Sequence, residues 1–379
     1  MKVLHLGPLN VKTGGPTLST YLAMKGIERQ GHESAIMTMP LAPGDKWYAD
    51  DVTLHLTKMY TIPYYGYIPG FQHTLSVALH YDIIHLQGLW MHLFHGGAVY
   101  ARKHKIPYVI SLRGNLYSQA LSHKKTLKRL FRLLFQDKDL HNAACIHATC
   151  YDELRYYREL GFQNPVAVIP NPISTEGIID RPIPEKKEFV IGYLGRLHPR
   201  KRVERLIYAV DFLRAQNIDV KLKIIGSDDK EYEDFLRNEV KRLKLDCVEF
   251  TGFLVDDDKD KAIMGLSVLA CAADFENFGN IVTEALVRGV PVMATKGMPW
   301  KSLDEYKCGW WVENDQDTIN NTLFTIAGLG ESRLREMGFN GKKMIREHYS
   351  LDAVGKKLTE MYEWIKSGGT APDFIDVTE

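Results

Sequence analysis

Two glutamates flank seven residues at a point where an apolar strand gives way to a helix. The segment Glu276–Glu284 reads ENFGNIVTE, and it follows an apolar run that ends at Cys271. A glycine such as Gly279 lets the backbone approach a ligand closely, and the free N–H groups of a helix start favour phosphate. The two carboxylates can therefore face different parts of one ligand. They can equally be ordinary acids favoured near a helix N-terminus.

Two cations follow another strand end. In Tyr193–Ile207, YLGRLHPRKRVERLI, Arg196 and Lys201 lie between Gly195 and a helix expected near Val203. A planar guanidinium and a compact ammonium together suit a diphosphate, although a solvated basic loop has the same composition.

A pair of glycines marks a third strand–helix junction. Gly14 and Gly15 precede a helix containing Leu18–Met24, and they allow that helix to start close to a phosphate or a sugar. A tight turn is the alternative. The spacing is not G-x-G-x-x-G, so the dinucleotide fingerprint is absent.

The elements that must position these residues form a strand–helix alternation, which predicts an α/β fold with doubly wound parallel sheets. The alternation restarts at Phe189 after a proline-rich stretch, so two Rossmann-like domains are expected, 1–170 and 174–350, facing across a cleft. A helix over 351–366 should pack back toward the first domain, and the polar tail 367–379 is predicted to be disordered. The expected strands are 2–6, 82–86, 107–112, 145–149, 189–194, 220–225, 248–251, 267–271 and 291–294.

Bulk composition excludes several classes of protein. The 379 residues carry a formal net charge of +1, which gives no general field for nucleic acid. Five cysteines without a C-x-x-C pair indicate neither a disulfide framework nor a zinc site, and a reduced, cytoplasmic setting is expected. The acidic runs Asp228-Asp229 and Asp256–Asp258 fall in loops or helix starts and are interpreted as solvated acids, so no metal is expected.

The ordered motifs from Lys2 to Leu358 resemble the family-four retaining glycosyltransferases of the GT-B fold, of the bacterial polysaccharide-assembly type. The resemblance rests on the three junctions above and on further segments. These are DIIHLQGLW (82–90), SLRGN (111–115), AT (148–149), VIPN (168–171), TGF (251–253) and GVPV (289–292).

The resemblance implies roles for the residues of both halves. Arg196 and Lys201 would hold the donor diphosphate, Glu276 the transferred sugar and Glu284 the ribose, with Arg196, Lys201 and Glu276 acting in catalysis. The nucleotide sugar is a substrate, and no cofactor or metal is expected. The anomeric configuration would be retained because the acceptor attacks the anomeric carbon on the face from which the leaving group departs. Further donor contacts are expected from Gly14, Gly15, Gly195, Phe253, Asn277, Phe278, Gly279, Asn280 and Ile281.

One departure from the family pattern concerns the acceptor half. Similar proteins often have H-x-H-G-L-W where this chain has Gln87, and glutamine can form hydrogen bonds but cannot carry a proton at neutral pH. His85 is expected to be a satisfied core histidine. Arg113 is expected to line the cleft, with a surface loop as its alternative. The candidate sugar or acceptor contacts are Gln87, Trp90, Arg113, Asn115 and Asn171.

Two segments bear on the acceptor. Segment 123–138, HKKTLKRLFRLLFQDK, reads as a basic amphipathic helix; its apolar stripe (Leu127, Leu130, Phe131, Leu134, Phe135) is expected to be core, and its basic side is expected to contact the inner face of a membrane. The tyrosine-rich stretch 60–71 either stacks on sugar rings or is an irregular packed loop.

The predicted function is therefore transfer of a hexose from a nucleoside-diphosphate sugar to a glycan or lipid-linked saccharide, in surface polysaccharide or lipopolysaccharide assembly. The alternatives are an NAD-dependent oxidoreductase or epimerase, a non-catalytic nucleotide-sugar-binding protein, and a phosphorolytic enzyme.

Overall fold

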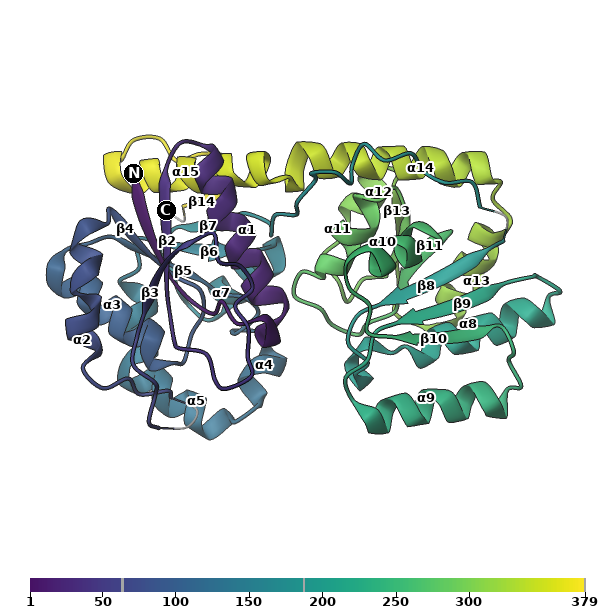
Figure 1. The fold of residues 1–379 in the computed structure, drawn as a ribbon, viewed down its shortest axis with the longest axis horizontal. Coiled ribbons are helices and arrows are strands. Elements are labelled where there is room, and N and C mark those ends of the chain that lie inside the picture. Colours follow the sequence, from purple (N-terminus) through teal and green to yellow (C-terminus); the bar gives the residue numbers. More distant parts are fainter. Residues whose placement is uncertain (63–64, 187, 378–379) are drawn as a thin grey trace. The chain divides into compact units, whose positions relative to one another are not determined.

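A computed structural model describes residues 1–62, 65–186 and 188–377 (Figure 1). The chain divides into two compact units. The first unit contains Met1–Ser174 together with the C-terminal segment that begins at Tyr349. The second unit contains Thr175–His348. The C-terminal segment thus belongs to the same unit as the N-terminus.

The first unit is built on one sheet with the strand order β14-β7-β6-β5-β4-β1-β2-β3, parallel except for β14. Helices alternate with the parallel strands, as their near-continuous apolar runs require. The strands are β1 (Lys2–Leu6), β2 (Glu33–Thr38), β3 (Thr53–Leu56), β4 (Ile83–Leu86), β5 (Tyr108–Ser111), β6 (Cys145–Ala148), β7 (Val166–Val168) and β14 (Ile375–Asp376). The α-helices are α1 (Gly15–Arg29), α2 (Phe71–Thr74), α3 (His92–His104), α4 (Ser118–Ser122), α5 (Lys125–Phe131), α6 (Asp137–His141), α7 (Tyr151–Glu159) and α15 (Leu351–Ser367).

The second unit has a parallel sheet with the order β10-β9-β8-β11-β12-β13. Its strands are β8 (Val190–Leu194), β9 (Lys221–Ile225), β10 (Val248–Gly252), β11 (Val268–Cys271), β12 (Val292–Thr295) and β13 (Gly309–Val312). Its α-helices are α8 (Glu204–Ala215), α9 (Lys230–Arg242), α10 (Asp256–Met264), α11 (Asn280–Leu286), α12 (Ser302–Glu305), α13 (Gln316–Ala327) and α14 (Glu331–Met344). Each unit is a doubly wound α/β fold, which is the predicted fold class.

Helix α15 packs on α1 through two glycines, and both helices belong to the first unit (Figure 1). A Cβ added at Gly355 would lie 2.2 Å from the carbonyl oxygen of Gly26, and a Cβ at Gly26 would lie 2.7 Å from that of Leu351. The backbones therefore touch at this crossing, and no larger residue fits either position without displacement.

The prediction that the tail is disordered is wrong for its central residues. Ile375 and Asp376 form β14, which pairs antiparallel with β7. Ile375 is buried, and Asp376 forms an ion pair with Arg158 of α7. The buried Ile375, the partly buried Phe374 and the ion pair of Asp376 tie the tail to the sheet edge, and the polar average of the segment conceals these contacts.

The segment 123–138 is not one continuous helix, and the prediction that its apolar stripe is core is wrong for two members. Helix α5 passes into a π-helical turn over Arg132–Gln136 before α6 begins. Such a turn shifts the register of the faces. Leu130 is 49% exposed and Leu134 is 67% exposed, and Leu133 between them is 77% exposed.

Aromatic rings of the first unit join this segment to the tyrosine-rich loop. Tyr65 lies beside Phe131 and Phe135, with ring centroids 5.6 Å from each, while Tyr60 and Tyr67 are exposed. Pro63 and Tyr64 of the same loop lie outside the described residues.

Candidate functional site

The carboxyl ends of β8 and β11 bring the two predicted donor motifs of the second unit together. These strands are neighbours in a parallel sheet, so the loops that follow them leave from the same edge. The loop after β8 carries Arg196 and Lys201, and the loop after β11 carries Glu276.

Close backbone packing fixes the first of these loops. Gly195 has φ 137°, and a Cβ added at Gly226 would lie only 1.9 Å from the Gly195 carbonyl oxygen. The Tyr193 hydroxyl donates to the Arg196 carbonyl at 2.7 Å. The contacts of Gly226 and Tyr193 therefore fix the backbone of the turn that carries the cations.

Lys201 and Glu276 form an ion pair between the two loops. Their side chains are only 14% and 17% exposed. Burial, with a smaller contribution from the nearby Arg200, lowers the pKa of Lys201 to about 8, although the Glu276 carboxylate favours the charged ammonium. The ammonium is thus a partly desolvated cation, which a second anion can engage strongly.

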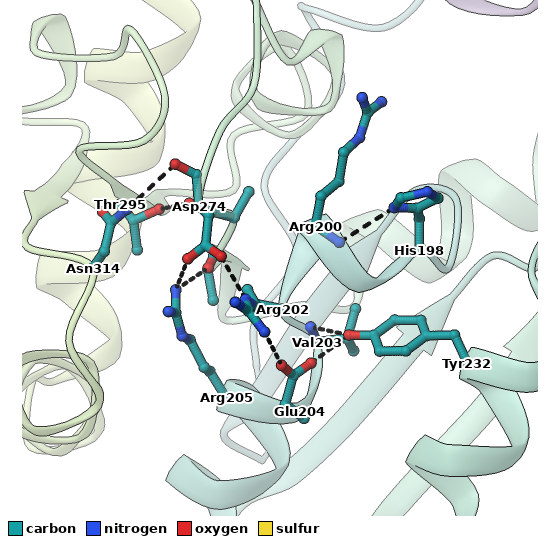
Figure 2. Close-up of polar contacts among 12 residues, drawn as sticks. His198, Arg200, Arg202, Val203, Glu204, Arg205, Tyr232, Asp274, Thr295 and Asn314 are labelled. Atoms are coloured by element: carbon teal, nitrogen blue, oxygen red, sulfur yellow. Dashed lines mark hydrogen bonds and ion pairs between the residues drawn. The ribbon is translucent and has the colours of Figure 1, made fainter. Parts of the chain in front are cut away.

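A network around Asp274, which the sequence analysis missed, joins the two loops from behind (Figure 2). One Asp274 oxygen accepts from Arg202 Nε at 2.5 Å, and the other contacts Arg205 NH1 at 2.8 Å. The Asp274 N–H donates to the Arg200 carbonyl, and Asn314 Nδ2 donates to the Asp274 carbonyl. The only signal in the sequence was an acid two residues before Glu276, which by itself is too common to be informative.

The start of α11 is shaped by buried aromatic rings. Gly279 caps the helix with φ 78°, and a Cβ there would lie 2.5 Å from Met298 Cε. Trp300 Nε1 donates to the Phe278 carbonyl at 2.5 Å, and the two rings lie 5.2 Å apart. Asn277, Asn280 and Ile281 are partly exposed around this turn. Glycine suits this position because the left-handed backbone strains other residues and a Cβ would displace the end of the Met298 side chain.

The remaining donor candidates of the second unit lie near this edge but in separate contacts. Glu284 forms an ion pair with Lys259 of α10 at 2.5 Å, a partner that the sequence analysis missed. Arg196 is largely exposed and lies 3.6 Å from Asp228. Phe253, after β10, is 75% exposed.

In the first unit, Gln87 and Arg113 meet at the carboxyl ends of β4 and β5. Gln87 is buried, and its Oε1 accepts from Arg113 NH2 at 2.7 Å and from Arg113 Nε at 3.3 Å. Its Nε2 donates to His5 Nδ1 at 2.9 Å. Arg113 also donates to Asn171 Oδ1 at 3.2 Å and to Thr20 Oγ1 at 3.4 Å.

Behind this pair runs a chain of neutral hydrogen bonds. The Tyr362 hydroxyl of α15 bonds to His85, His85 to Ser111, and Ser111 to His147, at 2.7, 2.8 and 2.8 Å. Burial lowers the pKa of His5 to about 3 and that of His147 to about 4, and it lowers the pKa of His85 well below its usual value. The interpretation of His85 as a satisfied core histidine is confirmed.

The other candidates of the first unit have local roles. Gly14 precedes α1 with φ 69°, and both Gly14 and Gly15 are exposed. The Trp90 N–H donates to Gln136 Oε1 at 2.9 Å, and Lys128 Nζ lies 5.4 Å from the Trp90 ring centroid. Asn115 Nδ2 donates to the Leu112 carbonyl.

Within the described ranges, no group of three or more His, Cys, Asp and Glu side chains could hold a metal ion. Asp229 caps α9, and Asp256–Asp258 form the exposed first turn of α10. No described helix is both long enough and apolar enough to cross a membrane.

Comparison with known proteins matches both halves of the chain. The family described as "Glycosyl transferases group 1" matches residues 176–344, and the family described as "Glycosyl transferase 4-like domain" matches residues 14–172. The chain is therefore a glycosyltransferase with a glycosyltransferase 4-like domain followed by a group 1 domain. The oxidoreductase and epimerase alternative is wrong, because the glycosyltransferase models account for both α/β units.

Individual relatives of this glycosyltransferase agree with the assignment. An uncharacterized glycosyltransferase of Methanocaldococcus jannaschii is 28% identical over 313 residues, which cover 75% of each chain. A phosphatidyl-myo-inositol mannosyltransferase of Mycobacterium leprae is 26% identical over 66% of this chain and 68% of its own. The solved structure of Anabaena HepE with UDP and glucose superposes with a TM-score of 0.73 at 18% identity, covering 96% of this chain and 99% of HepE. The predicted GT-B fold class is thereby confirmed.

Proposed function

We propose that this glycosyltransferase transfers a hexose from a nucleoside-diphosphate sugar to a glycan or lipid-linked saccharide, with retention of configuration and without a metal. The observation that carries the proposal is the meeting of Lys201 and Glu276 at neighbouring strand ends. A partly buried cation beside a carboxylate suits a diphosphate joined to a sugar, because the cation attracts phosphate and the carboxylate accepts from sugar hydroxyls.

The donor lies along the carboxyl edge of the second sheet in this proposal. Lys201 and Arg196 hold the diphosphate, Glu276 holds the sugar, Glu284 accepts from the ribose hydroxyls, and Phe253 borders the base. The UDP complex of Anabaena HepE supports a nucleotide sugar as donor. The backbone around Phe278–Ile281 supplies additional phosphate or sugar contacts.

Chemically, the bond between the anomeric carbon and the leaving phosphate oxygen breaks, and the acceptor oxygen bonds to that carbon on the same face. The acceptor proton passes to the leaving phosphate. Arg196 and Lys201 stabilise the negative charge that develops on the phosphate, which is the task that a metal has in other transferases. Glu276 positions the sugar and forms no covalent bond, so a trapped glycosyl adduct on a carboxylate would overturn this mechanism.

A membrane contact through 123–138 belongs to the same proposal. Leu130, Leu133 and Leu134 are exposed beside Lys124, Lys125 and Arg129. Apolar side chains flanked by cations suit the surface of an anionic membrane. The acceptor in this proposal is a lipid-linked saccharide of polysaccharide assembly, on the inner face of the membrane, and the protein is otherwise cytoplasmic. A phosphatidyl-myo-inositol mannosyltransferase among the relatives supports a lipid acceptor. Unchanged vesicle co-sedimentation of a Leu133→Ser, Leu134→Ser variant would contradict the contact.

A thermal-shift screen against UDP, GDP, ADP and dTDP sugars, with and without EDTA, tests the donor side. A ligand that binds the folded protein raises the midpoint. Sugars of one nucleotide class should raise the midpoint of the wild type with and without EDTA. The same sugars should not raise the midpoint of Glu284→Ala. The exposed Glu313→Ala is the control. The non-catalytic alternative predicts binding without any release of nucleotide when sugar acceptors or water are present.

A further inference from the structure

Arg113 combines a left-handed backbone with a position at the carboxyl edge of the first sheet. Its backbone has φ 48°, the left-handed region that costs a non-glycine residue free energy. The residue follows β5 at the carboxyl edge of the sheet, where open α/β sheets bind ligands. Such strain is retained where the surroundings hold a residue in one position.

The contacts that hold Arg113 come from three other parts of the unit. Gln87 follows β4, Thr20 lies on α1 and Asn171 follows β7, and all three accept from the guanidinium. Because the Gln87 amide nitrogen donates to His5, its oxygen is the atom that faces Arg113. The guanidinium is therefore fixed by neutral oxygens, and the residue as a whole is partly exposed.

No carboxylate among the described residues forms an ion pair with this guanidinium. Glu153 favours the charged form of Arg113, but its own oxygens accept from the Gly114 N–H, the Thr149 N–H and the Thr149 hydroxyl. The three imidazoles behind Arg113 (His5, His85, His147) are kept neutral by burial. Burial lowers the pKa of Arg113 to about 10, so it stays a cation at neutral pH.

From this arrangement we infer that Arg113 is an oxyanion-binding residue, and that a substrate handled by the first unit presents a phosphate or carboxylate group to it. A guanidinium has five N–H donors, and one NH1 hydrogen is left over after the contacts to Gln87, Asn171 and Thr20, so Arg113 can donate one charge-assisted hydrogen bond to such a group. The term substrate rests on the proposed function, whereas the binding of an oxyanion does not. Gln87 is then the group that orients Arg113.

The test uses the full chain and equilibrium binding, so it does not depend on turnover. α-Glucose 1-phosphate, glucuronate, UDP and neutral glucose are titrated into wild type, Arg113→Gln and Arg113→Lys. The matched control is Arg132→Gln, an arginine of the same unit that has a carboxylate partner in Asp137. We expect Arg113→Gln to bind at least one anionic probe ~10- to 100-fold more weakly, with Arg113→Lys in between, because a charge-assisted hydrogen bond is lost.

The probes also distinguish the source of the oxyanion. A loss for glucose 1-phosphate or glucuronate assigns it to an anionic acceptor, and a loss for UDP alone assigns it to the donor diphosphate. Unchanged affinity for all three anions, or an equal loss for glucose, would overturn the inference and leave Arg113 as a loop-holding residue. If Arg113→Gln fails to fold, NMR of the wild type replaces it. Inorganic phosphate should then shift the Arg113 Nε–Cζ resonances, and resonances that do not move would refute the site. Failure here leaves the Glu284-dependent nucleotide binding of the second unit untouched.

Discussion

Replacing Glu276 by glutamine should separate donor binding from sugar transfer. The Lys201 ammonium is paired with Glu276 in a partly buried setting. A donor diphosphate must therefore compete with this carboxylate for Lys201. Glu276→Gln keeps the size of the side chain but removes the competing charge.

The expected size of the effect follows from electrostatics. Two unit charges 4 Å apart attract by ~4 kcal/mol near a protein surface, and desolvation offsets much of this, so we expect a net ~1–2 kcal/mol. The variant should unfold ~2–8 °C lower without ligand. It should also bind the cognate nucleoside diphosphate ~5- to 30-fold more tightly. Its kcat should fall ~10- to 100-fold, because the charge-assisted contact to the sugar is lost.

Calorimetric titration with the nucleoside diphosphate and a nucleotide-release assay measure the two effects separately. Glu313→Gln is the matched control, since Glu313 forms an exposed ion pair with Lys296 in the same unit and should change none of these quantities appreciably. Weaker nucleotide binding in Glu276→Gln, with the rate unchanged, would refute the competition between the carboxylate and the diphosphate.

Three further predictions concern pH and packing. The pKa of Lys201 is about 8, so the affinity for nucleoside diphosphate should fall as pH rises from 8 to 9.5, whereas Lys201→Arg should keep its affinity over that range. Nucleotide titrations at each pH check this, and an equal fall in both proteins counts against Lys201 as the phosphate contact. His5 and His147 have folded pKa values of about 3 and about 4, below the unfolded 6.5, so their neutral forms stabilise the protein above pH 6.5. Urea midpoints should decrease as pH falls from 6.5 toward 4, and a flat profile would contradict the buried neutral cluster. Gly355→Ala places a Cβ 2.2 Å from the Gly26 carbonyl and should cost ~1–3 kcal/mol of unfolding free energy in denaturant melts. Gly328→Ala, whose Cβ would lie at 3.5 Å from its nearest neighbour, should be nearly neutral, and equal melts for the two variants would show that the helix crossing is loose.

The sequence predicted those parts of the fold whose signals are local. The strands that carry the donor loops, β8 and β11, are apolar runs with glycine or acidic residues directly behind them, so Lys201 and Glu276 could be assigned to one sheet edge. The strands β2, β3, β7 and β13 were missed. Strand β7 has only three residues, and β13, with the sequence GWWV, is a four-residue strand that begins with glycine, although its tryptophans and valine favour strands.

Features that depend on long-range contacts could not be predicted. Strand β14 is ordered because a buried isoleucine pairs with β7. The π-helical turn after α5 has no marker in the sequence. The position of Gln87 is a similar case. Its replacement of a family histidine was visible, but its engagement with both His5 and Arg113 requires three strands to be placed side by side.

The most direct test of the proposed chemistry is proton NMR of donor hydrolysis. The purified protein is incubated with UDP-α-glucose, UDP-α-N-acetylglucosamine or GDP-α-mannose, and the first sugar released is observed before mutarotation. We predict that one donor releases its sugar as the α-anomer, that EDTA has no effect, and that Glu276→Gln slows the release. The β-anomer as first product would contradict retention. Absence of any nucleotide release from a donor that binds would contradict transfer itself.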